Sequence, residues 1–266
     1  QQTAARDGEH PTDAKADRTE GEGSGADARD DHGPDGTSPP PLLHRGAAAS
    51  TRPVAMPAPA AALADDPHAR FEDALARART AQPYEASPLS PSSLDPTAMT
   101  LATVDGAGQP AARIVLLKGH DERGFVFYTN RTSKKGQDLA AQAKAALLFF
   151  WPLLAEQVRV EGLVELVSDA ESDAYFATRP RDSQLGAWAS LQSQTLARRE
   201  ELVERLRELE ARFAGREVPR PPHWGGYRVL PLRMEFWKEA PYRLHERDVY
   251  ERNAPGEPWT RRSLYP

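Results

Sequence analysis

The chain contains no cysteine. This absence excludes disulfide bridges, thiolate metal sites and a cysteine nucleophile, and it is consistent with the cytoplasmic location that we predict. No apolar run approaches the roughly 20 residues that a membrane-spanning helix requires. We therefore expect no membrane as a partner.

Aromatic residues are missing from the first 70 residues, which are rich in alanine, aspartate, glycine and proline. Such a segment cannot bury enough apolar surface to offset the entropy lost on ordering it. We predict a disordered tail over residues 1–63 and a folded domain over residues 64–266. The tail is acidic, which argues against a transit peptide and against nucleic acid as a partner. The chain begins with Gln rather than Met, so we expect its natural start to be missing.

Within the predicted domain, hydrophobic periodicity indicates a succession of strands with few helices between them. The expected helices span 65–81, 168–177 and 195–214, and the expected strands span 99–104, 112–117, 125–130, 145–151, 157–166, 227–238 and 242–250. The first two strands flank residues 105–108, a sequence typical of a hairpin turn. The pattern favours a predominantly antiparallel β fold with added helices over repeated parallel βαβ units.

Two segments carry specific expectations about burial. Strand 157–166 alternates, so its apolar residues are expected on one buried face: Val158, Val160, Val164 and Leu166. Helix 195–214 is expected to bury a single apolar stripe and to end at Gly215: Leu202, Leu206, Leu209 and Phe213.

Basic residues lie at strand ends beside hydroxyl groups. Arg113 and Lys118 bracket an apolar run, and Lys134 and Lys135 follow the strand that ends at Asn130, within a short loop. Phosphate needs both positive charge and directed hydrogen bonds, which such residues supply together. The spacing therefore predicts a phosphate site, although a solvated basic edge fits the spacing equally well.

Three other groups of residues have two interpretations on spacing alone. Arg179, Arg181 and Ser183 surround Pro180, where they would hold a second anion or simply end a helix. Gln192 and Ser193 fit two roles equally well, that of ligands in a binding site and that of the N-terminal cap of helix 195–214. A residue such as Gln157, on the polar face of a strand, is more often a surface residue than a ligand.

Near the C-terminus, Arg243, His245 and Arg247 are two residues apart, which puts them on one face of the expected strand 242–250. A cationic stripe is costly against a core, so this face is expected to meet solvent, a partner subunit or an anionic ligand. Gly225 and Gly226 are interpreted as a strand-entry turn. The sequence has no glycine-rich phosphate loop of the Rossmann or P-loop type and no spacing of metal ligands, so we expect no metal.

Taken together, these segments resemble the pyridoxine/pyridoxamine 5′-phosphate oxidase family. Each motif is weak alone, but the ordered set is specific and runs from about Asp95 to the C-terminus. The motifs in chain order are Arg113 to Lys118, Phe127 to Asn130, Ser133 to Gly136, Gln157 to Gly162, Tyr175 to Ser190, Gln192 to Ser193, Pro219 to Arg228, Glu235 to Trp237 and Arg243 to Arg247.

The resemblance implies an FMN-binding split β-barrel homodimer with FMN at the subunit interface and a dimerisation region over about 219–266. The implied reaction oxidises pyridoxamine or pyridoxine 5′-phosphate to pyridoxal 5′-phosphate by hydride transfer to the flavin, with O₂ as oxidant and H₂O₂ as product. By motif position, the FMN-binding residues are Arg113, Lys118, Tyr128, Thr129, Lys134, Lys135, Gln157, Gln192, Ser193, Trp237 and Arg247. The substrate-binding residues are Lys118, Tyr175, Arg179, Ser183, Arg243 and His245, and the catalytic residues are Arg243, His245 and Asp95.

The chain departs from the family pattern at the edges of the implied site. Glu156 stands where an arginine is usual, residues 238–241 replace the usual Gln-Gly, and Ser263 replaces an arginine. Two alternatives therefore stay open: a related flavin oxidase of the phenazine-biosynthesis type, and a non-catalytic FMN or pyridoxal-phosphate binding protein. Retention of Tyr175, Arg179 and Ser183 argues against the first alternative, because only a substrate phosphate requires them.

Overall fold

The computed structural model describes residues 66–81 and 95–266. The predicted tail and most of the Pro/Ser-rich segment after the first helix, residues 82–94, lie outside the described residues. In the described part of the chain, no helix combines the length and the apolar character needed to cross a membrane.

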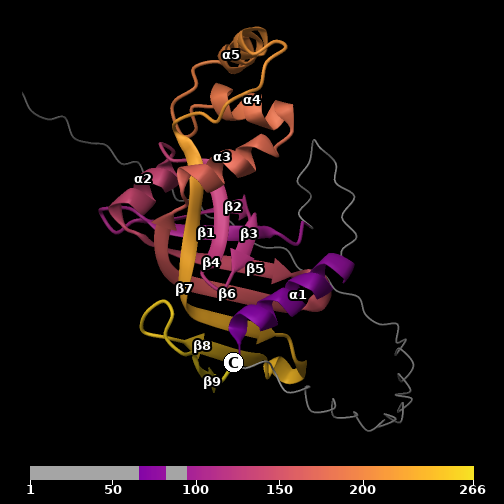
Figure 1. The fold of residues 1–266 in the computed structure, drawn as a ribbon. Coiled ribbons are helices and arrows are strands. Elements are labelled where there is room, and N and C mark those ends of the chain that lie inside the picture. Colours follow the sequence, from indigo (N-terminus) through magenta and orange to yellow (C-terminus); the bar gives the residue numbers. More distant parts are fainter. Residues whose placement is uncertain (1–65, 82–94) are drawn as a thin grey trace, which may run out of the picture. The chain divides into compact units, whose positions relative to one another are not determined.

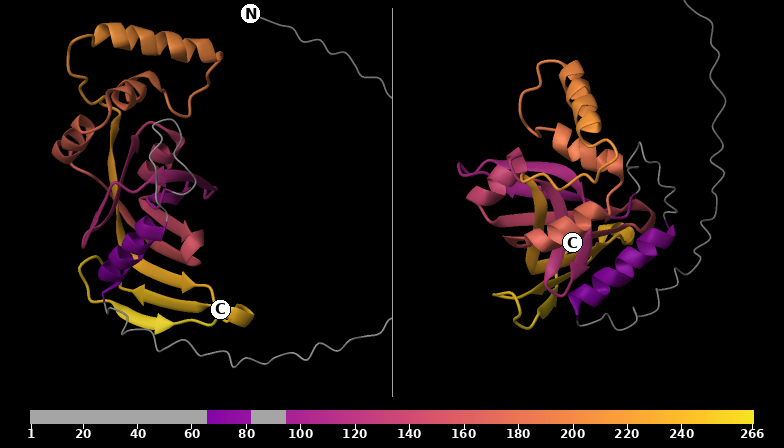
Figure 2. Two further views of the ribbon diagram at one scale, coloured as in Figure 1. Left: turned by 90° about the vertical axis from the view of Figure 1, so that its right-hand side faces the viewer. Right: turned by 45° about the horizontal axis from the view of Figure 1, so that its top comes forward.

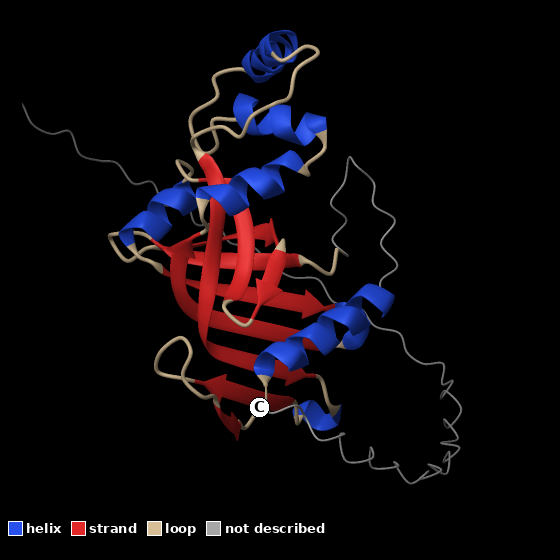
Figure 3. Cartoon of the chain, in the orientation of Figure 1, coloured by secondary structure: helices blue, strands red, loops and turns tan. Residues whose placement is uncertain are grey.

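The described strands form one nine-stranded antiparallel sheet (Figures 1 and 3). Their bounds are β1 Ala98–Val104, β2 Pro110–Leu116, β3 Gly119–Asp121, β4 Gly124–Asn130, β5 Lys144–Trp151, β6 Glu156–Leu166, β7 Trp224–Lys238, β8 Glu246–Glu251 and β9 Thr260–Ser263. The order across the sheet is β2-β1-β5-β6-β7-β4-β3, and β8 and β9 continue from β7. This arrangement confirms the predicted antiparallel fold with helices.

The β1–β2 hairpin forms where the turn sequence predicted it. Its register runs from Ala98 opposite Leu116 to Val104 opposite Pro110. The Asp105 carboxylate accepts hydrogen bonds from two backbone N–H groups of the turn, and this local bonding closes the hairpin.

The long strand β7 joins the two parts of the sheet, because its first half pairs with β4 and its second half pairs with β8. Beside it, the β6–β7 register shifts between Glu161 and Gly162, because β7 carries one extra residue there, Leu232, as a bulge. A Cβ atom on Gly162 would stand 1.9 Å from the Leu230 carbonyl oxygen, so this close approach requires glycine. The bulge lets the sheet curl, as the two views in Figure 2 show.

The predicted alternation of β6 holds up to the last residue of the strand. Val158 and Val160 are buried, as expected, and Val164, beyond the register shift, is half-buried and packs against the core. Leu166 is the last residue of β6 and is 59% exposed, so its predicted burial is wrong.

Five helices accompany the sheet in the described residues: α1 Pro67–Ala81, α2 Lys134–Ala141, α3 Asp169–Ala177, α4 Arg181–Ala189 and α5 Arg199–Arg212. Helix α1 covers the main core with Phe71, whose ring lies 4.8 Å from that of Phe125 and 5.0 Å from that of Phe149. The Asp66 carboxylate accepts the His68 backbone N–H at the start of α1. The predicted helix over 65–81 is confirmed, with observed bounds Pro67–Ala81.

A smaller core forms where α3, α4 and α5 meet the start of β7 (Figure 2). It contains Phe176, Leu185, Phe213 and Trp224. Helix α5 begins at Arg199, later than predicted, and its leucines are only half-buried because it packs mainly on α4. Helix α4 was not predicted.

The predicted strand 242–250 is wrong in its first half. Residues Pro241–Arg243 form a short 3-10 helix, η2, and β8 begins at Glu246. Tyr242 and Arg243 have φ angles of 58° and 62°, in the left-handed region, where no strand continues. Gly225 and Gly226, predicted as a turn, instead lie inside β7 and pair with β4.

Candidate functional site

A cavity of about 310 Å³ opens between β2, β4, α2, α3 and the start of β7. It brings together seven of the residues predicted for the site: Lys118, Tyr128, Thr129, Lys135, Tyr175, Arg179 and Gln192. Residues 114–116 and Trp224 supply an apolar wall. The cavity therefore combines cations, hydroxyl groups and an apolar surface, as a site for a phosphorylated aromatic molecule requires.

Two cations of the cavity have no carboxylate bonded to them in the described residues. The side chain of Lys118 reaches the surface, yet burial by its neighbours lowers its pKa; the Asp95 charge opposes this shift and the Arg179 charge adds to it. Burial likewise lowers the pKa of Arg179, whose Nη1 is buried without a hydrogen-bond partner among the described residues. Cations that are partly shielded from water and have no carboxylate beside them favour an anionic partner, so this pair is suited to an anionic ligand.

Aromatic rings stack beside these cations. The Tyr128 and Tyr175 rings lie 4.2 Å apart and nearly parallel, and the Trp224 ring lies 5.2 Å from that of Tyr128. Burial raises the pKa of both tyrosines, so their phenol groups stay protonated and can donate hydrogen bonds.

A second set of polar groups converges at the N-terminus of α2. The Lys135 ammonium group donates to Ser133 Oγ and to Gln192 Oε1, both at 3.1 Å. The Lys134 backbone N–H donates to Ser193 Oγ, also at 3.1 Å. A helix N-terminus with a lysine and hydroxyl groups beside it is a favourable place for a phosphate.

These contacts correct two predictions from the sequence. Lys134 and Lys135 occupy the first turn of α2 rather than a loop. Gln192 and Ser193 do not cap the long helix, whose N-cap is Arg198; instead they bond to the start of α2. Ser193 has a φ angle of 67°, which turns the chain toward α2.

Asp138, a buried residue that the sequence analysis missed, holds two of the predicted cations. Its carboxylate accepts from Lys134 Nζ at 2.5 Å and from Thr103 Oγ1 at 2.7 Å, while Arg113 donates to the same Thr103 hydroxyl at 2.6 Å. Burial alone would raise the pKa of Asp138, but these hydrogen bonds outweigh it and lower the pKa. The i, i+4 spacing from Lys134 was the available signal.

The remaining predicted FMN residues form a separate group at the far end of β7. Gln157 and Trp237 line another cavity, of about 300 Å³, between β6, β7 and α1. Trp224 and Trp237 stand at opposite ends of β7, roughly 40 Å apart along an extended strand of this length. One chain thus does not bring the two groups together.

The C-terminal cations do not share a strand face as predicted. Only Arg247 lies on β8, where it donates to the buried Glu235 carboxylate through Nε at 2.9 Å. His245 lies between η2 and β8, with its ring 4.7 Å from that of Trp237. Arg243 is exposed in η2. Tyr242 and Arg243 have left-handed φ angles, so the chain is not extended there. Residues two apart in this segment therefore do not share one face of a strand.

Glu156, the charge reversal noted in the sequence, is buried beside Gln157. Its carboxylate pairs with Arg77 of α1 at 2.9 Å and with Lys238 at 3.6 Å. The negative charge is therefore neutralised locally, and it anchors α1 to the end of β6.

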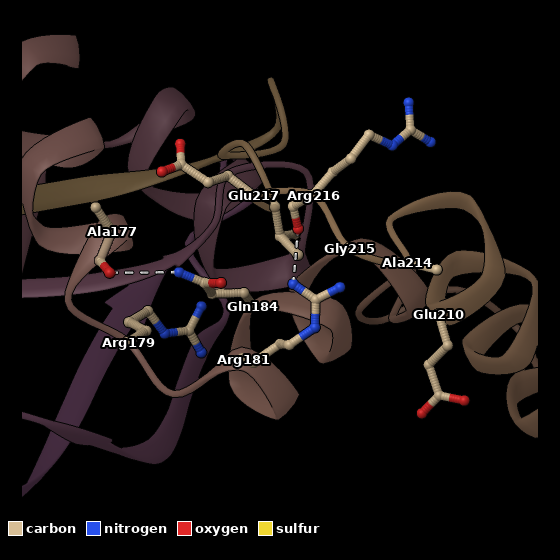
Figure 4. Close-up of a pocket in the computed structure, with 10 residues that line it drawn as sticks. Ala177, Arg179, Arg181, Gln184, Glu210, Ala214, Gly215, Arg216 and Glu217 are labelled. Atoms are coloured by element: carbon tan, nitrogen blue, oxygen red, sulfur yellow. Dashed lines mark hydrogen bonds between the residues drawn. The ribbon is translucent and has the colours of Figure 1, made fainter.

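Arg179 also borders a larger cavity of about 810 Å³ between α3, α4 and the end of α5 (Figure 4). Here Arg181 donates to the carbonyl oxygens of Phe213 and Arg216. Of the two interpretations given for Arg181, the structural one is therefore the one observed. Ser183 lies half-buried on α4 and lines neither cavity. Of the predicted site residues, only Arg179 and Arg181 line this cavity, so the smaller one remains the candidate site.

Asp95 lies at the edge of the described residues. Its carboxylate accepts from the backbone N–H and the hydroxyl group of Thr97, at 2.8 and 2.7 Å. Its charge acts on the pKa of Lys118, so it belongs to the surroundings of the cavity.

Comparison with known proteins gives consistent matches along the described chain. A family model described as pyridoxamine 5′-phosphate oxidase matches residues 93–213, and one described as pyridoxine 5′-phosphate oxidase C-terminal dimerisation region matches residues 224–266. A pyridoxine/pyridoxamine 5′-phosphate oxidase of Anaeromyxobacter dehalogenans is 55% identical over 211 residues, which cover 79% of this chain and 100% of the relative. One of Alkalilimnicola ehrlichii is 56% identical over 197 residues, covering 74% and 98%.

Two solved structures share the fold. PhzG from Burkholderia lata, in complex with tetrahydrophenazine-1-carboxylic acid, superposes with a TM-score of 0.67 at 32% identity over 76% of this chain and 93% of that one. A pyridoxamine 5′-phosphate oxidase-related, FMN-binding protein from Nostoc punctiforme gives a TM-score of 0.57 at 19% identity over 74% and 97%, which supports the fold alone.

Proposed function

The chain belongs to the pyridoxamine 5′-phosphate oxidase family, and we propose that it uses FMN to oxidise pyridoxamine or pyridoxine 5′-phosphate to pyridoxal 5′-phosphate. The observation that carries this proposal is the pair of cations, Lys118 and Arg179. They share a cavity, and neither bonds to a carboxylate in the part of the chain that the structure describes. A phosphorylated substrate would supply the missing negative charge.

The residues in and beside the cavity fit FMN in two respects. The N-terminus of α2, with Lys135, Gln192 and Ser193, offers donors to the cofactor phosphate. Residues 114–116 offer an apolar surface to the ring system, and Ile114 is 65% exposed beside it. When bound, FMN supplies the acceptor for the hydride that leaves the substrate, and we propose that O₂ then serves as the final oxidant.

The side chains of this chain then bind and orient the two molecules. Lys118, Tyr175 and Arg179 would hold the substrate phosphate, and Tyr128 and Thr129 would contact the cofactor. Arg113 and Lys134, already fixed by Asp138 and Thr103, would add positive charge near the cofactor phosphate.

We propose a homodimer that completes the site. The second predicted group, near Trp237, lies too far along β7 to meet the cavity of its own chain. The outer face of the sheet between the two groups exposes Ile114 and Phe150, at 65% and 58%. A second copy packed on this face would cover these residues and bring Gln157, Trp237, Arg247, Arg243 and His245 to the cavity.

A cytoplasmic location stays a prediction, based on the lack of cysteine. The phenazine-type alternative has support from the fold of PhzG at 32% identity. The arrangement of Lys118, Tyr175 and Arg179 around one cavity favours a phosphorylated substrate instead.

The experiment is to purify the protein, load it with FMN and add pyridoxamine 5′-phosphate in air, following the absorbance of pyridoxal 5′-phosphate and the release of H₂O₂. Formation of both products supports the proposal. A yellow protein that binds pyridoxal 5′-phosphate without turnover would indicate a binding protein, and a yellow protein that does neither would favour another substrate. A protein that FMN neither colours nor stabilises would overturn every flavin function.

A further inference from the structure

Arg179 is held differently from the arginines of this fold that pair with carboxylates. Arg228, for example, is 4% exposed and pairs with three carboxylates, those of Asp121, Glu165 and Glu171. The Arg179 guanidinium group instead lies over the Trp224 ring, 4.8 Å from its centroid, and 5.5 Å from the centroid of Phe176. Ring faces attract a cation without using its N–H donors or cancelling its charge.

Trp224 is itself fixed from several sides. It is 5% exposed, it pairs with Asn130 across the β4–β7 ladder, and its carbonyl oxygen accepts from Arg220 at 2.6 Å. The Phe176 ring meets it edge-on at 5.1 Å. The indole is thus a rigid platform rather than a mobile cover.

The same platform supports the tyrosines of the cavity. The Trp224 ring is nearly parallel to that of Tyr128, which in turn stacks on Tyr175. Gly226, two residues after Trp224 on β7, makes room for this stack, because a Cβ atom there would stand 2.8 Å from a Tyr128 ring carbon. One tryptophan therefore contacts the arginine and anchors the two phenol groups of the cavity.

We propose that Trp224 is a positioning residue that holds Arg179 in place for the substrate phosphate, and so determines the preference for phosphorylated over unphosphorylated ligands. The inference rests on the proposed function, since it names the group that recognises the phosphate of that substrate. A guanidinium group held by ring faces keeps its full charge and its free donors for the ligand. A ligand without a phosphate leaves that charge without a partner, which disfavours its binding.

The test compares Trp224→Leu and Trp224→Phe with the wild type, using FMN-loaded protein. A matched control is Trp188→Leu, because Trp188 also carries an arginine over its ring, Arg212 at 5.4 Å, but lies outside the candidate cavity. Two readouts are needed: the dissociation constants of pyridoxal 5′-phosphate and of pyridoxal, and the separate KM and kcat values for pyridoxamine 5′-phosphate.

Trp224→Leu is expected to weaken pyridoxal 5′-phosphate binding about tenfold while leaving pyridoxal binding unchanged. KM should rise by a similar factor, and kcat should change less. Trp224→Phe keeps a ring face and should retain most of the affinity, and Trp188→Leu should alter stability without altering the preference for the phosphate. In a double variant with Arg179→Ala, the loss of Trp224 should add little.

Equal weakening of both ligands, or no weakening of either, would overturn the positioning role. If Trp224→Leu fails to fold, Trp224→Phe takes its place, alone and combined with Arg179→Ala. The same comparison of ligands then decides the question, with a smaller expected loss of affinity for pyridoxal 5′-phosphate. If the wild type itself binds neither FMN nor pyridoxal 5′-phosphate, the proposed function fails instead, so the two failures are distinguishable.

Discussion

Cations play opposite parts in two regions of this fold. On the face of β6, β7 and β8, the buried carboxylate of Glu235 accepts hydrogen bonds from Arg159, Arg233 and Arg247, between 2.7 and 3.0 Å. In the cavity near α2 and α3, neither Lys118 nor Arg179 bonds to a carboxylate of residues 66–81 or 95–266. Cations that are paired within the chain stabilise the fold, whereas cations left without a carboxylate are available to a ligand.

The largest effect on stability is expected from Glu235→Gln. The carboxylate is 3% exposed and pairs with three guanidinium groups. Arg159 and Arg233 keep other carboxylate partners, but Arg247 would lose the one that it has among the described residues. We expect the free energy of unfolding to fall by about 3 kcal/mol, measured by urea denaturation. Glu201→Gln on the surface of α5 is the control and should change little. An equal effect from both variants would remove the distinction between the two regions.

Arg179→Ala should do the reverse, with a large effect on binding and a small one on stability. We expect KM for pyridoxamine 5′-phosphate to rise roughly 10- to 100-fold, since a charge-assisted contact to the phosphate is lost. Thermal melting should stay close to that of the wild type because no ion pair is broken. Arg207→Ala, on an exposed part of α5, is the control. A strongly destabilised protein with normal KM would mean that Arg179 is structural.

Arg243→Ala tests the group of predicted site residues near Trp237, of which Arg243 is an exposed member. Its place in η2 leaves it free of hydrogen bonds in the described residues, so the proposed dimer would use it at the substrate rather than in the fold. We expect turnover to fall about tenfold with FMN affinity nearly unchanged, measured by steady-state kinetics and fluorescence titration of FMN. Loss of FMN alone would show that Arg243 belongs to the cofactor site.

The smallest expected effect concerns pH and lies outside both regions. Burial lowers the pKa of His68 and of His120, where α1 packs on the sheet. The folded protein therefore binds these protons less readily than the unfolded chain, whose histidines titrate near 6.5. The free energy of unfolding should therefore be highest above about pH 6.5. It should decrease as pH falls from there to the lowered pKa values that the two histidines have in the folded protein. Melting temperatures measured between pH 7.5 and pH 5 check this.

Replacing His68 by Leu should flatten this dependence, because both ring nitrogens of His68 are buried without a partner in the described residues. Carboxylates with lowered pKa, such as Asp248, lose their contribution only at more acidic pH. A pH profile unchanged by His68→Leu would assign the effect to other groups.

Much of this fold was predictable because alternation and turn chemistry act locally. The β1–β2 hairpin and α1 depend on turn residues and periodicity within a short segment, and both were found as expected. The bulge of β7 opposite Gly162 depends on how two distant strands pair, and the left-handed residues of η2 follow no hydrophobic period, so the sequence pattern missed both. Strands β3 and β9 are too short to show a period.

The candidate site was predicted in composition but not in arrangement. Motif positions named Lys118, Tyr175 and Arg179, which do share a cavity. They did not indicate that Trp237 lies far from this cavity, at the other end of β7. A motif names a residue of the site but does not give its distance from the others within one chain. Trp224 and Asp138 were missed, since each acts on another side chain rather than showing a motif of its own.

The most direct test of the central claim is the thermal shift that pyridoxal 5′-phosphate causes in the wild type and in the Lys118→Ala/Arg179→Ala double variant, with pyridoxal as the phosphate-free comparison. A ligand that binds the folded state raises Tm, and the rise is larger for a tighter ligand at the same concentration. We predict a clear rise for the wild type with pyridoxal 5′-phosphate, and none for the double variant with either ligand. An undiminished rise in the double variant would contradict the claim that these two cations are kept for the phosphate.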